Sequence, residues 1–267
     1  MARIRVNGVD LRVEERGAGA PILGIHGTPS CAALWADAAE RLAEHGRCLT
    51  YDRRGFARSG GSDADAATSL DDHVADAAAL LEQVDATPAA VIGRSTGGLI
   101  ALELARRHPE AVSALVLLEP ALFTTDAATR AWAADARGRI AAAAADQPDR
   151  AAEAVFRIML GDDAWTGLPE EARDAFATAN GGVLAELAGD GLDLSARPRT
   201  YERHELAAVR APTLILVADA SPEPLHRAAE WIANRLPNAR IAHVGGGHLI
   251  DPADPAVAEF IGAHGAE

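Results

Sequence analysis

Residues 89–102 read AAVIGRSTGGLIAL, and this stretch decides the fold. Its first four residues have the composition of a short buried strand, and its last four begin a helical pattern. Between them, Gly93-Arg94-Ser95-Thr96-Gly97 fits the pattern G-x-S-x-G. Glycines permit a sharp strand-to-helix turn, which exposes the serine hydroxyl at a helix N-terminus. The stretch therefore predicts a nucleophilic Ser95 at the edge of a parallel sheet.

Strand and helix patterns alternate on both sides of this turn. The expected strands cover 3–7 and 9–16, a hairpin around Asn7-Gly8, and then 21–25, 47–51, 88–93, 112–118, 213–218 and 240–244. The expected helices cover about 33–45, 70–84 with Ser69 as N-cap, 96–108, 224–235 and a last one from 253. This alternation predicts an α/β fold with a mostly parallel, eight-stranded sheet flanked by helices.

The alternation is interrupted by an alanine-rich segment without strand patterns. Helices are expected there at about 127–145, 149–160 and 169–188. We therefore expect one sheet domain, residues 1–122 and 206–267, with an inserted helical cap at 123–205. The large apolar residues of this cap are Phe123, Trp132, Phe156, Met159, Trp165 and Phe176. Most should pack in a core, and some should line an apolar substrate pocket over Ser95.

Composition restricts the partners of the protein. There are 39 acidic against 25 basic residues, a net charge of −14, which disfavours nucleic acid and anionic membranes. No apolar run approaches the roughly 20 residues of a membrane span, and residues 1–6 enter a strand pattern without a signal peptide. Cys31 and Cys48 are the only cysteines, which favours a reducing cytoplasm and two buried thiols. No metal or organic cofactor is expected, and composition does not distinguish a monomer from a homodimer.

Two further motifs lie where strands end. Gly245-Gly246-Gly247-His248 follows the last strand, and its glycines allow the imidazole to return over Ser95 as the general base. His26-Gly27-Thr28-Pro29 follows an earlier strand. A tetrahedral intermediate needs two preorganised donors, and we expect the backbone N–H groups of Thr28 and Thr96 to supply them. His26 is expected to brace this loop.

Together these motifs resemble the α/β-hydrolase superfamily along essentially the whole chain. A fourth piece, Tyr51-Asp52-Arg53-Arg54-Gly55-Phe56-Ala57-Arg58-Ser59, is similar to cofactor-free haloperoxidases and small actinobacterial hydrolases. Ala57 departs from the pattern, because relatives usually have glycine there. Arg94 is also unusual, and we expect it to balance Glu119 or Asp52 rather than to bind a substrate carboxylate. A serine at position 95 excludes relatives that use an aspartate nucleophile.

The position of the catalytic acid is the open question. The resemblance places the usual acid after the penultimate strand, where Ser221 stands and Asp219 lies two residues earlier. Glu119 follows four apolar strand residues and would be costly to bury without a partner. Zearalenone-type lactonases and some dehalogenases look similar here, with glutamate in this place. We therefore favour Glu119 as the partner of His248 and keep Asp219 as the alternative.

The resemblance implies a serine hydrolase that cleaves a hydrophobic carboxylic ester or lactone through an acyl-enzyme on Ser95. Two other classes remain open. A non-hydrolytic enzyme, a perhydrolase or a C–C lyase, would use the same residues, and a ligand-binding sensor would bind without turnover. Fold alone does not separate them.

Overall fold

The computed structural model describes residues 2–60 and 67–264. Eight strands form one mostly parallel sheet, as the sequence predicts, and the structure gives their order as β1-β2-β4-β3-β5-β6-β7-β8. They are β1 (Ala2–Val6), β2 (Val9–Arg16), β3 (Pro21–Ile25), β4 (Arg47–Tyr51), β5 (Ala89–Arg94), β6 (Val112–Leu118), β7 (Thr213–Ala218) and β8 (Ala239–Val244). The β1–β2 and β2–β4 pairs are antiparallel, and all other pairs are parallel. The central strands therefore all end at the same edge of the sheet.

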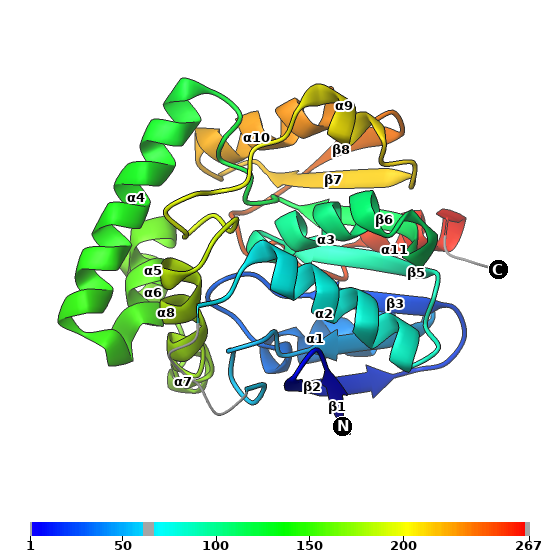
Figure 1. Ribbon diagram of the computed structural model, residues 1–267, viewed down its shortest axis with the longest axis horizontal. Helices are drawn as coiled ribbons and strands as arrows, with labels where there is room; N and C mark the ends of the chain where they lie inside the picture. The colour runs from blue at the N-terminus through cyan, green and yellow to red at the C-terminus, as the bar shows by residue number, and fades with distance from the viewer. Residues whose placement is uncertain (1, 61–66, 265–267) are drawn as a thin grey trace.

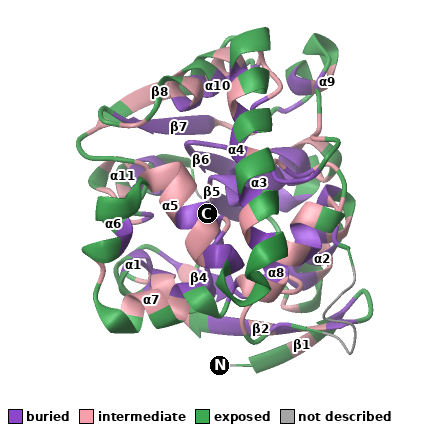
Figure 2. Ribbon diagram, turned by 90° about the vertical axis from the view of Figure 1, so that its left-hand side faces the viewer, coloured by how far each residue is buried: buried purple, intermediate pink, exposed green. Residues whose placement is uncertain are grey.

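Helices cover both faces of the sheet (Figure 1). Apolar side chains of α2 (Leu70–Gln83), α3 (Thr96–Arg107) and α10 (Glu223–Ala233) pack on one face. Those of α1 (Ala36–Leu42), the preceding 3-10 turn (Ala32–Trp35) and α11 (Pro255–His264) pack on the other. Successive side chains of strand β5 pack against the helices on opposite faces of the sheet: Val91 lies in the core on the first face and Ile92 in the core on the second. Figure 2 shows the result as buried central strands, among them β5, β6 and β7, inside partly exposed helices.

The segment between β6 and β7 is helical, and it stands at one end of the sheet (Figure 1). We call residues 123–205 the cap segment. It contains α4 (Ala127–Asp146), a 3-10 turn (Pro148–Arg150), α5 (Ala151–Leu160), α6 (Asp162–Thr166), α7 (Glu170–Ala177) and α8 (Asn180–Ala188). The single helix expected at 169–188 is wrong, since the chain turns at Thr178–Ala179 and separates α7 from α8. The short α9 (Arg203–Ala207) leads back to the sheet.

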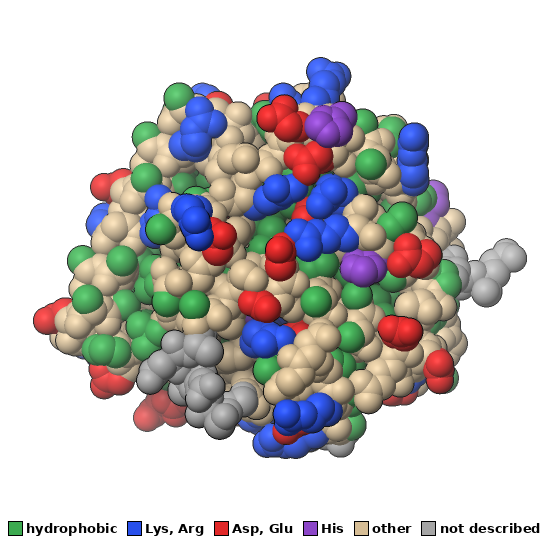
Figure 3. All heavy atoms as spheres, viewed as in Figure 1, with side chains coloured by type: hydrophobic (Ala, Val, Ile, Leu, Met, Phe, Trp, Pro, Cys, Tyr) green, Lys and Arg blue, Asp and Glu red, His purple; other side chains and the backbone are tan. Residues whose placement is uncertain are grey.

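The helix cap at Ser69 and the burial of the two cysteines are as the sequence predicts. Ser69 caps α2 and forms a reciprocal capping box with Asp72. Both cysteines are buried and free. Acidic and basic side chains are interspersed on the face shown in Figure 3, so the net negative charge is not gathered into one patch there. Within residues 2–60 and 67–264, no helix has the length and hydropathy needed to cross a membrane.

Candidate active site

Ser95 occupies a tight turn between β5 and α3. Its backbone has φ 55° and ψ −120°, a strained conformation that the surrounding contacts hold in place. A Cβ atom at Gly93 would lie 2.3 Å from the carbonyl oxygen of Gly97, and one at Gly97 would lie 2.1 Å from that of Ile25. Both positions therefore require glycine. The Ser95 N–H donates to the Leu118 carbonyl at 2.9 Å, which ties the turn to the end of β6.

Glu119 follows β6 directly and is fully buried. Its Oε2 lies 2.6 Å from Nδ1 of His248, and it also accepts from the Ser221 hydroxyl at 2.9 Å. Its Oε1 accepts from the Ala218 N–H at 2.8 Å. An ionised carboxylate only accepts, so the contact assigns the proton to Nδ1 and leaves Nε2 free to accept one. Ser221, in the slot where relatives usually have the acid, thus serves as a donor to Glu119.

Asp219 lies apart from this arrangement. Its side chain is 67% exposed, and its nearest charged partner is His243 at 3.7 Å. Arg94 pairs with neither Glu119 nor Asp52, contrary to the expectation from sequence. Its guanidinium donates to the Ile250 carbonyl at 3.4 Å and lies 5.6 Å from the centre of the Trp35 ring. Burial lowers the pKa of Arg94 to about 10.

The loop after β3 lies against Ser95. A Cβ atom at Gly27 would be 3.0 Å from the Cβ of Ser95, so Thr28 follows close to the nucleophile. In the part of the chain that the structure describes, the backbone N–H groups of Thr28 and Thr96 have no hydrogen-bond acceptor. His26 braces the loop, since its ring contacts the Gly27 carbonyl at 2.8 Å and the Arg53 N–H at 3.0 Å. Burial and the nearby Arg53 guanidinium hold the pKa of His26 well below its ordinary value.

A cavity lies beside Ser95, His248 and Thr28. It contains about 530 Å³ of empty space, counting the part open to solvent. Ser95 and His248 both line it, although no hydrogen bond joins their side chains among the described residues. Such contacts are often long in ligand-free enzymes. The apolar part of the cavity wall consists of Pro29, Val155, Phe156, Met159, Leu160, Phe176, Leu194 and Leu249.

Three of the aromatic residues expected in this pocket lie elsewhere. Phe123 and Trp132 pack edge to face at 5.1 Å in a separate cluster beside Leu225. Trp165 packs behind the cavity wall, 5.3 Å from Phe156. Large aromatic rings gain most from burial against each other, and this outweighs exposure to a cavity.

Two acidic residues of the cap segment, Glu186 and Asp193, belong to the site although no sequence motif predicts them. Glu186 is fully buried and bonds to Arg53, and Asp193 lines the cavity beside Ser95. Burial, together with the negative charge of Glu186, raises the pKa of Asp193 to about 7. Neither residue belongs to a motif, so only the packing of the cap on the sheet reveals them.

Comparison with known proteins identifies the family of this chain. Residues 20–250 match the family model of the alpha/beta hydrolase fold, and the chain therefore belongs to the α/β-hydrolase family. It is 29% identical to BpoC of Mycobacterium tuberculosis H37Rv, provisionally named a non-heme bromoperoxidase, over 90% of this chain and 91% of that protein. The solved structure of BpoC superposes with a TM-score of 0.73 at 26% identity, covering 100% of this chain and 99% of that one.

Two further relatives show how widely the fold is shared. The uncharacterized hydrolase YraK of Bacillus subtilis is 36% identical over 120 residues, which are 45% of this chain and 44% of YraK. This chain thus matches less than half the length of YraK. An enol-lactonase from Burkholderia xenovorans LB400 superposes with a TM-score of 0.70 at 22% identity, covering 97% of this chain and 98% of that one. At this identity the likeness concerns the fold alone.

Proposed function

We propose that the protein is a serine hydrolase that cleaves a carboxylic ester or lactone through an acyl-enzyme on Ser95. The contact of 2.6 Å between His248 and Glu119, at the sheet edge where Ser95 is exposed on its turn, carries this proposal. A serine hydroxyl is a weak nucleophile until a base accepts its proton, and an oriented imidazole beside a buried carboxylate is such a base.

The proposed mechanism assigns one role to each group. Nε2 of His248 accepts the Ser95 proton as the oxygen attacks the carbonyl carbon. Glu119 holds the tautomer and stabilises the imidazolium that forms. The N–H groups of Thr28 and Thr96 donate to the developing oxyanion. His248 then protonates the leaving alcohol, and a water activated by His248 hydrolyses the acyl-enzyme.

The lining of the cavity supports an apolar substrate. Val155, Phe156, Met159, Leu160 and Phe176 all come from the cap segment and face the space beside Ser95. Hydrophobic walls with a few polar groups are typical of small-molecule sites. We therefore propose a substrate with an apolar acyl or alcohol portion. A lactone remains in the proposal because of the resemblance at Glu119.

The test is hydrolysis of p-nitrophenyl esters and of simple lactones by the wild type and by Ser95→Ala. The proposal predicts turnover that Ser95→Ala abolishes, with circular dichroism showing that the variant is folded. If no ester or lactone is turned over in a Ser95-dependent manner, the proposal is wrong.

A second candidate reaction uses the same acyl-enzyme. BpoC, similar to this chain over 90% of its length, carries a bromoperoxidase name. If hydrogen peroxide rather than water attacks the acyl-enzyme, a peracid leaves and the serine is regenerated. Peracid formation from acetate and peroxide, measured through bromide oxidation and compared with ester hydrolysis under the same conditions, separates the two reactions.

A further inference from the structure

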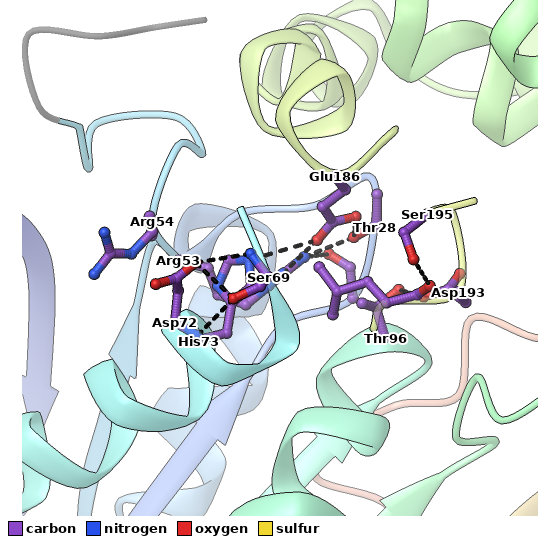
Figure 4. A network of polar contacts seen from close by, with 12 residues as sticks. Thr28, Arg53, Arg54, Ser69, Asp72, His73, Thr96, Glu186, Asp193 and Ser195 are labelled. Atoms are coloured by element: carbon purple, nitrogen blue, oxygen red, sulfur yellow. Dashed lines mark hydrogen bonds and ion pairs between the residues drawn. The ribbon is translucent and has the colours of Figure 1, made fainter. Parts of the chain in front are cut away.

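The two threonines beside Ser95 are held by acids of the cap segment. The Thr28 hydroxyl donates to Oε2 of Glu186 at 2.8 Å, and the Thr96 hydroxyl donates to Oδ1 of Asp193 at 2.8 Å. Figure 4 shows both contacts, which reach from the cap to the loop after β3 and to the start of α3. Each residue with a free backbone N–H beside the nucleophile is thus fixed through its side chain by the cap.

The contact at Thr28 belongs to a closed ring of hydrogen bonds among Thr28, Arg53 and Glu186. Arg53 donates through Nη1 to Oε1 of Glu186 at 2.6 Å and through Nη2 to the Thr28 hydroxyl at 2.6 Å. Its Nη2 also reaches the Gly27 carbonyl at 3.2 Å. Arg53 and Glu186 are both fully buried, so neither charge is screened by water. Such a pair fixes the distance between α8 and the loop that contains Thr28.

The contact at Thr96 is different, because Asp193 has no cation within ion-pair distance among the described residues. Its carboxyl lies at the cavity beside the residue that follows the nucleophile. A neutral carboxyl there does not oppose an oxyanion, whereas an ionised one does. The raised pKa of Asp193 fits this requirement.

The anchoring of the cap acids to the sheet domain is firm. The Thr68 N–H donates to the Ala185 carbonyl at 3.1 Å, and the Leu70 N–H to the Asp190 carbonyl at 2.9 Å. A Cβ atom at Gly182 of α8 would lie 2.5 Å from the Phe56 ring, so the helix packs closely on the turn after Arg53. Because the cap segment is fixed on the sheet domain, Glu186 and Asp193 hold Thr28 and Thr96 at defined positions.

We propose that the cap segment completes the oxyanion hole, with Glu186 and Asp193 as positioning residues that hold the N–H groups of Thr28 and Thr96 in place through the threonine hydroxyls. The inference rests on the proposed function of Ser95. Its consequence is that cap packing controls the rate of acyl transfer more than the affinity for substrate, because the oxyanion forms only in the transition state.

Valine substitutions test the proposal. Thr28→Val and Thr96→Val each remove the hydroxyl, keep the backbone N–H and nearly conserve the shape. Removing an oxyanion donor outright costs about 10²–10³-fold in kcat, so misplacing one should cost on the order of 10-fold. We expect that loss in kcat on p-nitrophenyl butyrate, with KM changed less than about 3-fold. Thr96→Ser, which keeps the hydroxyl, should restore the rate.

The matched control is Thr129→Val. The Thr129 hydroxyl also donates to a cap acid, Asp126, at 2.8 Å, and Thr129 is also buried. This variant should lose stability and keep its kcat. Adding Asp193→Ala to Thr96→Val should cost little more than Thr96→Val alone, because each change by itself already removes the hydrogen bond between the Thr96 hydroxyl and Asp193.

A second readout is the affinity for an alkyl boronic acid, which forms a tetrahedral adduct on Ser95 and places an oxygen in the oxyanion hole. This affinity should weaken in parallel with kcat in both valine variants. If both keep wild-type kcat and boronate affinity while their melting temperatures fall as in Thr129→Val, the contacts are structural only and the inference is wrong. A wild type without Ser95-dependent turnover would instead refute the proposed function, and the boronate affinities would still decide this inference.

Discussion

Replacing Glu119 by glutamine has a predictable effect, because both oxygens of its carboxylate have known hydrogen-bond partners. The carboxylate accepts from Ala218 N–H, from the Ser221 hydroxyl and from His248. A glutamine has one acceptor oxygen. When that oxygen bonds to the Ala218 N–H, the amide nitrogen faces Nδ1 of His248 with a proton of its own. The imidazole must then carry its proton on Nε2, where it cannot accept the one from Ser95.

The magnitude follows from the same contacts. Removing the acid's charge while keeping its shape costs about 10⁴-fold in kcat in a serine triad, because the imidazole adopts the wrong tautomer. Asp219→Asn changes an exposed side chain 3.7 Å from His243, where a surface ion pair contributes at most about 1 kcal/mol. We expect kcat of Glu119→Gln to fall about 10⁴-fold and that of Asp219→Asn to stay near wild type. Initial rates on p-nitrophenyl butyrate measure both.

A rescue variant sharpens this prediction. The Ser221 oxygen lies 2.9 Å from the same Glu119 oxygen that contacts His248. Adding Ser221→Asp to Glu119→Gln supplies a carboxylate near Nδ1 and should recover at least about 10-fold of the lost rate. If Asp219→Asn loses as much activity as Glu119→Gln, or if Glu119→Gln stays within 10-fold of wild type, the assignment of the acid is wrong.

Three further predictions concern the cavity, the buried ion pair and Asp193. Met159→Ala should widen the apolar wall and raise kcat/KM for p-nitrophenyl octanoate relative to the acetate several-fold, and an unchanged ratio would remove Met159 from the substrate path. Arg53→Met leaves Glu186 buried without its partner and should cost about 3–5 kcal/mol in the free energy of unfolding by urea. Glu186→Leu added to Arg53→Met should recover most of that loss, and a double variant as unstable as the single one would contradict this reasoning. Because the folded state holds the proton of Asp193 up to about pH 7, wild-type stability should fall as pH rises from about 4 to 7. In Asp193→Asn that part of the pH dependence should be missing from melting temperatures measured between pH 4 and 8.

The sequence predicts the sheet well, because its strands have clear patterns of apolar residues. Each central strand is an apolar run that ends at a turn signal, so the residues after those runs meet at one edge. The same reasoning finds Glu119, since a carboxylate directly after four buried residues needs a partner. The role of Ser221 as a donor to that carboxylate depends on how two loops meet, and it follows only from the structure.

The cap segment is less predictable for physical reasons. Its alanines favour helix at nearly every position and mark few boundaries, so the turn between α7 and α8 has no clear signal. The sequence also does not show which aromatic residues of the cap segment line the cavity, because aromatic rings pack on one another wherever they meet. Asp193 and Glu186 gain their importance from the threonines they contact, which are about 100 or more residues away along the chain.

The most direct test of the account is intact-mass spectrometry of the protein quenched during turnover of a p-nitrophenyl ester. If the acyl-enzyme forms on Ser95, the protein gains a mass equal to the acyl group, peptide mapping locates that mass on the peptide that contains Ser95, and Ser95→Ala lacks it. Ester turnover with no acyl adduct under these conditions, or an adduct that persists in Ser95→Ala, would contradict the acyl-enzyme on Ser95.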